Sequence, residues 1–221
     1  MSSERAFVPA ASRDVFLPFY DPIARLMGGD RARRDLIEQA NITSGQRILD
    51  IGCGTGTLAV QLKQQCADVE VVGLDPDPKA LHRAKAKATR AGVLVQFDQG
   101  FSDELPYASD SFDRVLSSLM FHHLEEQTRE KTLTEVVRVL HSGGFLHLLD
   151  FATSGDGHGH HSHEIHSHLM NLFHSKDRVE GTSDTRILEL MRNAGFKNAA
   201  KLKDGRMLFG LLRTAYYRAI V

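Results

Sequence analysis

Short apolar runs and longer amphipathic stretches alternate along the chain from about residue 30. The apolar runs have the length of strands, and in the stretches between them apolar residues recur at the period of a helix. The predicted strands cover residues 47–51, 69–74, 93–97, 112–118 and 145–151, and the predicted helices cover 30–40, 57–65, 78–91 and 125–140. This alternation predicts an α/β fold in which helices cover both faces of a mostly parallel sheet.

The last third of the chain follows a different pattern. Its predicted elements are a helix over 184–193 and two strands over 197–203 and 207–219. The dipeptide Asp204-Gly205 between the two strands is typical of a hairpin turn. We therefore expect one domain over residues 1–221, closed by an antiparallel C-terminal hairpin.

The most informative segment is Arg47-Ile-Leu-Asp-Ile-Gly-Cys-Gly-Thr-Gly56, a strand that runs into glycines at alternate positions. Gly52, Gly54 and Gly56 can adopt positive φ and have no Cβ to keep a ligand away from the main chain. The next strand ends in Asp75, at about the distance where a βαβ unit places a ribose-binding carboxylate. The spacing predicts a nucleoside ligand at the carboxyl ends of these strands.

The amino-acid composition limits which binding partners and which cellular location we expect for the protein. The chain has 27 basic and 28 acidic residues, without the basic excess of a nucleic-acid binder, so we expect no nucleic-acid partner. Its two cysteines, Cys53 and Cys66, cannot build a disulfide framework, which fits a reducing cytoplasm. No segment reaches the ~18 consecutive apolar residues of a membrane span. We expect a soluble, cytoplasmic protein with no membrane partner.

An ordered set of motifs resembles the class I S-adenosylmethionine-dependent methyltransferases, in particular the small-molecule branch that includes the ubiquinone/menaquinone C-methyltransferases. The motifs are Asp50-Ile-Gly-Cys-Gly-Thr-Gly56, Asp75-Pro76, Leu105-Pro-Tyr107, Ser111-Phe-Asp113 and Arg138-Val-Leu-His-Ser-Gly-Gly-Phe145. The resemblance implies a Rossmann-like, doubly wound, mostly parallel seven-stranded sheet with an antiparallel C-terminal hairpin strand. It also implies S-adenosylmethionine as the cofactor.

The resemblance assigns a set of cofactor-binding residues. Asp75 would accept hydrogen bonds from both ribose hydroxyls, and Asp50 would orient the glycine turn and the cofactor's ammonium. The implied set is Tyr20, Asp50, Gly52, Cys53, Gly54, Gly56, Asp75, Pro76, Phe101 and Ser118. Phe101 stands where the family often has an acid at the adenine amino group, so either Phe101 packs on the ring or Asp103 reaches the amino group.

The segment 117–124 ends the fourth predicted strand and, in the resembling fold, lies beside the cofactor's sulfur. His122 and His123 are its only titratable side chains and are the candidate catalytic residues. A histidine with a pKa of about 6.5 can accept a proton from the attacking group. The alternative is that the two rings pack or cap the start of the next helix.

Two further segments are expected to cover the site. The resemblance implies that residues 1–40 form an N-terminal arm and helix, with Phe16 and Tyr20 closing over the cofactor. Residues 153–183 form a histidine-rich, lid-like insertion. If part of it is helical, His160, Glu164 and His168 share one face, which permits a metal site. The uneven spacing favours a lid, and we expect no catalytic metal.

The expected function is methyl transfer from S-adenosylmethionine to a small organic acceptor by in-line displacement. One rival is an NAD-dependent oxidoreductase with a dinucleotide fold. Its Gly-x-Gly-x-x-Gly spacing would need a glycine where this chain has Thr57, and the terminal hairpin is foreign to that fold. The other rival is a module that binds the cofactor without catalysis. The acceptor and the oligomeric state are left open.

Overall fold

A computed structural model describes the backbone of residues 17–152 and 183–221, and the side chains from residue 21 onward within these ranges. Phe16 and residues 153–182, with the candidate metal ligands His160, Glu164 and His168, lie outside the described residues. The side chain of Tyr20 also lies outside them. The lid-like role of the histidine-rich insertion therefore stays a prediction.

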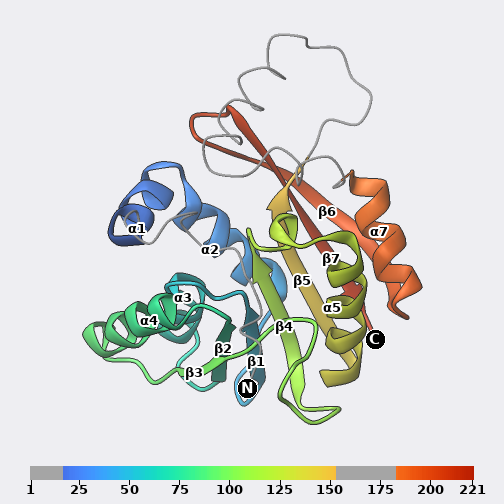
Figure 1. The fold of residues 1–221 in the computed structure, drawn as a ribbon, viewed down its shortest axis with the longest axis horizontal. Coiled ribbons are helices and arrows are strands. Elements are labelled where there is room, and N and C mark those ends of the chain that lie inside the picture. The colour runs from blue at the N-terminus through green and yellow to red at the C-terminus, as the bar shows by residue number, and fades with distance from the viewer. Residues whose placement is uncertain (1–16, 153–182) are drawn as a thin grey trace, which may run out of the picture.

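The described residues form a seven-stranded sheet with the strand order β3-β2-β1-β4-β5-β7-β6 (Figure 1). The strands are β1 (Arg47–Ile51), β2 (Glu70–Asp75), β3 (Gln96–Gln99), β4 (Phe112–Ser118), β5 (Leu140–Phe151), β6 (Lys197–Met207) and β7 (Leu212–Ile220). Neighbouring strands from β3 to β5 are parallel, and β7 is antiparallel to both β5 and β6. The predicted Rossmann-like α/β sheet with an antiparallel C-terminal hairpin is confirmed.

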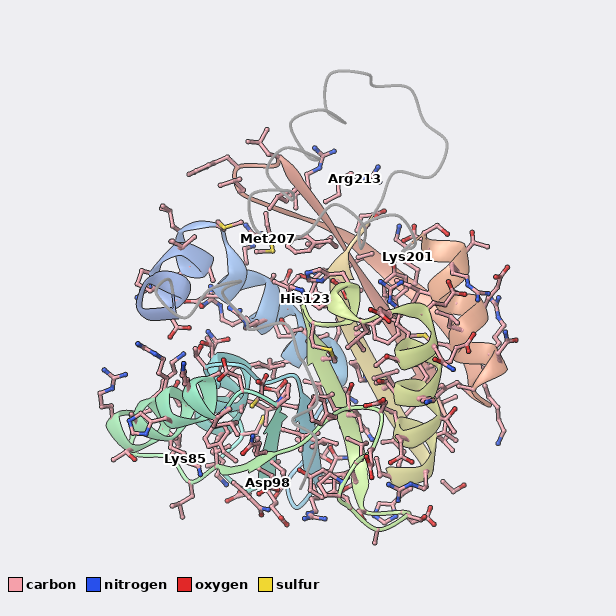
Figure 2. All side chains as sticks on the ribbon, in the orientation of Figure 1. Lys85, Asp98, His123, Lys201, Met207 and Arg213 are labelled. Carbon is pink, nitrogen blue, oxygen red and sulfur yellow. The ribbon has the colours of Figure 1, made fainter. Side chains whose placement is uncertain are left out.

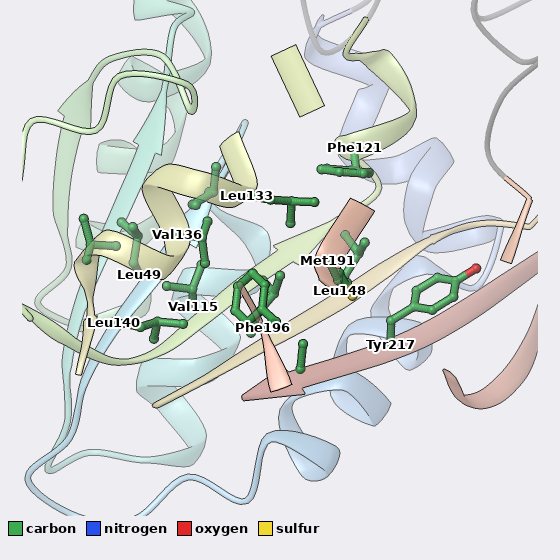
Figure 3. Close-up of a cluster of buried hydrophobic side chains, with 14 of the residues drawn as sticks. Leu49, Val115, Phe121, Leu133, Val136, Leu140, Leu148, Met191, Phe196 and Tyr217 are labelled. Atoms are coloured by element: carbon green, nitrogen blue, oxygen red, sulfur yellow. The ribbon is translucent and has the colours of Figure 1, made fainter. Parts of the chain in front are cut away.

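Two clusters of buried apolar side chains hold helices against opposite faces of this sheet. The helices are α1 (Leu17–Leu26), α2 (Gly29–Ala40), α3 (Thr57–Gln65), α4 (Pro78–Ala91), α5 (Glu126–Val139), α7 (Asp184–Asn193) and the short 3-10 turn η2 (Phe121–His123). One cluster takes Leu36 from α2 and Leu62 from α3. The other takes Leu133 from α5 and Met191 from α7, which pack against the strands in Figure 3. The ends of the strands are thereby held in place from both sides.

The helix α4 shows how local sequence fixes an element that follows the site. The Oδ1 of Asp77 accepts a hydrogen bond from the Lys79 backbone N–H at 2.8 Å, and Pro78 occupies the first turn, where no N–H is needed. Gly92 ends the helix in the left-handed conformation, with φ of 66°. The predicted bounds of this helix are confirmed.

The predicted hairpin turn at Asp204-Gly205 is wrong. Both residues lie within β6, paired with Ala215 and Thr214, and the chain reverses at residues 208–211 instead. The structure favours the later reversal because Met207 pairs with Leu212 and both side chains are buried in the core. A turn at Asp204-Gly205 would forfeit that burial.

Gly205 has a packing role instead of a turn role. A Cβ at this position would lie 2.5 Å from the Thr214 Oγ1 and 2.9 Å from the ring of Tyr216. The glycine therefore marks a close cross-strand approach, which a sequence pattern does not distinguish from a turn.

We predict that Gly56→Ala destabilises the protein more than Gly92→Ala. The φ angles are 75° at Gly56 and 66° at Gly92, so alanine is strained at both positions. Only the Cβ added at Gly56 meets another residue closely, the Ala84 Cβ at 2.7 Å, whereas nothing lies within 4 Å at Gly92. Urea denaturation should show a loss of about 2–5 kcal/mol for Gly56→Ala and about 1–2 kcal/mol for Gly92→Ala. Equal losses would contradict the packing role of Gly56.

Candidate functional site

A cavity of about 370 Å³ lies at the carboxyl ends of β1, β2 and β4. The strand order changes direction there, because β1 pairs with β2 on one side and with β4 on the other, and α/β sheets bind their ligands at such a point. The predicted site residues that line the cavity are Asp50, Gly52, Cys53, Gly54, Asp75, Pro76, Phe101, Ser118 and His123. Of the remaining predicted residues, Gly56 and His122 are not among the lining residues.

The glycine turn after β1 is held in place by backbone hydrogen bonds. The N–H groups of Gly52 and Cys53 both donate to the Leu74 carbonyl, at 2.8 and 3.0 Å. A Cβ on Gly52 would lie 2.2 Å from the Cγ of Met120, a flexible side chain in the cavity wall. In the structure, therefore, Gly52 makes room for a side chain of the protein.

Asp75 ties two loops together at the cavity wall. Its Oδ2 accepts the Gly54 N–H at 2.8 Å, and its Oδ1 accepts the Asp77 N–H at 2.9 Å. Burial raises the pKa of Asp75 to about 6, although the two N–H donors act in the opposite direction. Each carboxylate oxygen has one further lone pair with which it can accept a hydrogen bond from a ligand.

Asp50 is a buried carboxylate with incomplete hydrogen bonding. It is 1% exposed, and its Oδ2 has no partner among the described residues. Burial raises its pKa to about 7, with a smaller contribution from the charge of Asp75, while the charge of Arg33 acts to lower it. A buried carboxylate of this kind attracts a cationic or hydrogen-donating ligand group.

Arg33 is a cavity residue that sequence reasoning missed. Arg33 lies in the basic stretch 31–34, a pattern typical of a solvated helix face. In the structure Arg33 is buried, lines the cavity, and lies 3.7 Å from Asp30 on the same helix. The signal that could have found it is the apolar face of α2, because Leu36 and Ile37 are buried on this helix and Arg33 lies one turn before them. The cavity wall thus carries a buried guanidinium and a buried carboxylate.

The helix α1 is fastened to the glycine turn by Asp21. The carboxylate of Asp21 accepts hydrogen bonds from the hydroxyls of Thr55 at 2.6 Å and Thr57 at 3.1 Å, and lies 2.7 Å from the Lys87 Nζ. Burial acts to raise the pKa of Asp21, but the bonds from Lys87 and the two threonines lower it. Asp21, within the predicted N-terminal arm and helix, therefore contacts the cavity loop. Whether Tyr20 covers a ligand stays a prediction.

His122 and His123 are adjacent in the sequence but have different environments. The Nδ1 of His122 lies 2.5 Å from the Asp150 Oδ1, and its backbone N–H donates to the Asp150 Oδ2 at 2.8 Å. His122 is 5% exposed, whereas His123 lines the cavity above the end of β4 (Figure 2). The ring centroids of the two histidines are 4.1 Å apart. Only His123 therefore faces the cavity described here.

Asp103 and Glu125 add two acidic side chains to the lining, and the other remaining residues are apolar or weakly polar. Phe101 contributes an aromatic ring, and Ser118 contributes a hydroxyl that has no partner among the described residues. Burial raises the pKa of the Cys53 thiol well above its usual range, so this cysteine is not a thiolate nucleophile. Within the described residues, no three histidine, cysteine or acidic side chains are grouped as metal ligands.

The comparisons with known proteins find similarity to methyltransferases. Residues 48–144 match the model of a methyltransferase domain. Over 143 residues the chain is 37% identical to the demethylmenaquinone methyltransferase of Deinococcus radiodurans, covering 63% of this chain and 58% of that protein. Over 142 residues it is 34% identical to a ubiquinone/menaquinone biosynthesis C-methyltransferase of Geobacter sp. strain M21, covering 62% and 60%.

A solved structure shares the fold over nearly the full length. The S-adenosylmethionine-dependent methyltransferase from Aquifex aeolicus superimposes with a TM-score of 0.66 at 18% identity, covering 91% of this chain and 98% of that one. By contrast, the chain spans about three fifths of the length of the two curated relatives. None of the helices in the described ranges combines the length and the apolar character that crossing a membrane requires.

We predict that the ligand-free protein loses stability as the pH rises from about 4 to about 7, in part because of Asp50. Its folded pKa of about 7 lies above the ordinary value of 3.8, so the folded state retains a proton that the unfolded chain releases. In the variant Asp50→Asn this contribution disappears. At pH 8 the variant should be more stable than the wild type, by at most roughly 4 kcal/mol at 1.4 kcal/mol per pKa unit.

Urea denaturation at several pH values between 4 and 8 measures this difference. Asp98→Asn is the matched control, since Asp98 lies on β3 of the same sheet, two strands from β1, and does not line the cavity. The prediction for Asp50 fails if wild type and Asp50→Asn show the same dependence of stability on pH.

Proposed function

We propose that this chain, which belongs to the class I S-adenosylmethionine-dependent methyltransferases, binds that cofactor in the cavity and transfers its methyl group to a small organic acceptor. The observation that carries the proposal is that a buried carboxylate, Asp50, and a buried guanidinium, Arg33, line the same cavity, with Asp75 holding the adjacent glycine turn. A volume of about 370 Å³ suits a small-molecule site.

The residues present fit the amino-acid end of the cofactor. The unpartnered Oδ2 of Asp50 can accept a hydrogen bond from an ammonium, and the guanidinium of Arg33 can bind a carboxylate. A ligand with both groups would complete the hydrogen bonding of Asp50 and give Arg33 a second carboxylate beside Asp30. The incomplete hydrogen bonding of Asp50 in the ligand-free structure supports this assignment.

The loops after β2 and β3 would bind the nucleoside part of the cofactor. Asp75 retains a lone pair on each oxygen for the two ribose hydroxyls while it holds Gly54 and Asp77. Phe101 can stack on the adenine, Pro76 and Cys53 line the same wall, and Ser118 offers a hydroxyl. We assign Gly56, which the sequence placed in the cofactor-binding set, a packing role, because a Cβ there would lie 2.7 Å from the Cβ of Ala84 in α4.

When bound, S-adenosylmethionine supplies a methyl group activated on a sulfonium. The protein then has to hold the acceptor in line with that methyl, an effect that can contribute roughly 7–11 kcal/mol to lowering the barrier. His123 faces the cavity and can take the proton that the acceptor loses. The bonds from His122 to Asp150 fix the turn η2 that carries His123, so we assign His122 a positioning role.

The relatives bear on the rivals and on the acceptor. The match to a methyltransferase domain does not favour the NAD-dependent oxidoreductase. Two curated relatives are named for methylating quinone precursors, which supports an organic acceptor of low molecular weight. The absence of a nucleic-acid partner and the cytoplasmic location stay predictions.

We predict micromolar binding of S-adenosylmethionine and S-adenosylhomocysteine, on the order of −8 kcal/mol, with no competition by NAD. In Asp75→Ala the loss of charge-assisted hydrogen bonds should weaken binding at least tenfold, at ~1.5–3 kcal/mol each. Asp98→Ala is the matched control, because its carboxylate binds Gln96 and Tyr107 outside the cavity lining. Calorimetry that finds NAD binding, or an unchanged dissociation constant in folded Asp75→Ala, would contradict the assignment.

We predict different effects for the two histidine variants once an acceptor is found. His123→Gln should lower kcat by roughly 10²–10⁴-fold and leave the affinity for S-adenosylhomocysteine unchanged, because it removes a proton acceptor. His122→Gln should lower the unfolding temperature, because its ring bond to buried Asp150 is lost. Full activity of His123→Gln with an acceptor that must lose a proton would remove His123 from the mechanism.

A further inference from the structure

The reversal between β6 and β7 displays apolar side chains to solvent. Its four residues, Leu208-Phe-Gly-Leu211, include Phe209 at 89% exposure and Leu211 at 51%. The φ angles of Leu208 and Phe209 are 48° and 52°, a conformation that costs a residue with a Cβ roughly 1–2 kcal/mol. Glycine or asparagine would relieve this strain, so the chain retains bulky apolar residues where local energetics disfavour them.

A second exposed apolar segment is fastened to this reversal. The N–H of Leu208 donates to the carbonyl of Met27, just after α1, at 2.7 Å. On α1, Leu26 is 72% exposed and Ile23 is 40% exposed. We call the four exposed side chains from these two segments, Ile23, Leu26, Phe209 and Leu211, the apolar rim. A group of exposed apolar side chains marks an interaction site more often than a single exposed apolar side chain does.

Arginines flank the apolar rim. Strands β6 and β7 carry six basic residues and one acid, but Lys201 and Lys203 are paired with Asp184 and Asp35, and Lys197 and Arg218 lie at the far end of the hairpin. Arg206 and Arg213 pair directly across the hairpin next to the reversal, and Arg213 marks that end of the molecule in Figure 2. Arg25, 81% exposed at its side chain, adjoins Leu26. Basic residues on an edge strand also prevent sheet-to-sheet pairing, but that role does not explain the exposed Phe209.

We propose that the apolar rim inserts into the headgroup region of an anionic lipid bilayer, with the flanking arginines bound to lipid phosphates. An apolar tip within a basic surround is the pattern of proteins that lie on a membrane without crossing it. This differs from the expectation, drawn from the sequence, of no membrane partner. The chain bends at Leu208 and Phe209 so that aromatic and aliphatic side chains face outward together.

The proposal goes beyond the proposed function and does not need it. The apolar rim includes residues of α1, and α1 adjoins the cavity because Asp21 contacts Thr55 in the cavity wall. If the methyl transfer also holds, an acceptor dissolved in the bilayer could enter the cavity beside α1. Vesicle binding is measured without cofactor or acceptor, so its failure is distinct from a failure of S-adenosylhomocysteine binding in calorimetry.

The test is co-sedimentation of the full chain with vesicles of equal parts phosphatidylglycerol and phosphatidylcholine, and with phosphatidylcholine alone. We expect binding to the anionic vesicles, weakened by high salt. The double variant Phe209→Ser, Leu211→Ser should lower the partition coefficient at least tenfold, and Arg206→Gln, Arg213→Gln should remove the preference for anionic lipid. Leu94→Ser is the matched control, since Leu94 is 88% exposed but lies ahead of β3, at the opposite edge of the sheet, and it should bind like the wild type.

Four outcomes would overturn the proposal. The first two are a wild type that fails to sediment with anionic vesicles, and a double serine variant that binds as well as the wild type. In the third, the wild type is a dimer in gel filtration that the serine variant converts to monomer, which assigns the rim to a second copy of the chain. In the fourth, the serine variant unfolds at a markedly lower temperature, which assigns the rim to contacts within the chain.

Discussion

The carboxylate of Asp75 is the interaction on which the candidate site depends. It ends β2 and accepts N–H groups from Gly54, in the loop after β1, and from Asp77, at the start of α4. Two loops that begin on neighbouring parallel strands are thereby fixed relative to each other. Because the donors are backbone groups, the geometry survives only if the glycine turn keeps its positive φ angles. A single side chain thus holds two loops of the cavity wall in place and contributes to the charge of that wall.

The cavity is electrostatically unfavourable without a ligand. Burial raises the pKa values of Asp50 and Asp75 to about 7 and about 6, so both carboxylates are costly when charged at neutral pH. Arg33 offsets part of this cost for Asp50. Sites in which buried groups keep incomplete hydrogen bonding are suited to bind ligands that complete them. The same feature connects stability with function, because a ligand that carries an ammonium would relieve the strain on the folded state.

The order of the elements could be read from the sequence, because it depends on local patterns. The bounds of β1, β4, α3, α4 and α7 match the predicted ranges residue for residue. The hairpin turn could not be predicted, since Asp204-Gly205 has ideal turn chemistry and is overruled by the burial of Met207 against Leu212. Turn chemistry is local, whereas the register of a hairpin is set by which side chains reach the core.

The same division holds for the site. The sequence by itself determined the glycine turn and the acids at the ends of the first two strands, because glycines after the first strand and an acid after the second are a local signature of βαβ units that bind a nucleoside. Only the tertiary structure decided that Arg33 is buried in the cavity, that His123 faces it and that His122 turns to Asp150. These residues come from α2, from the segment after β4 and from β5, and their roles depend on how distant elements pack. Local sequence patterns show which face of a helix is buried, but they do not specify which distant elements pack against it.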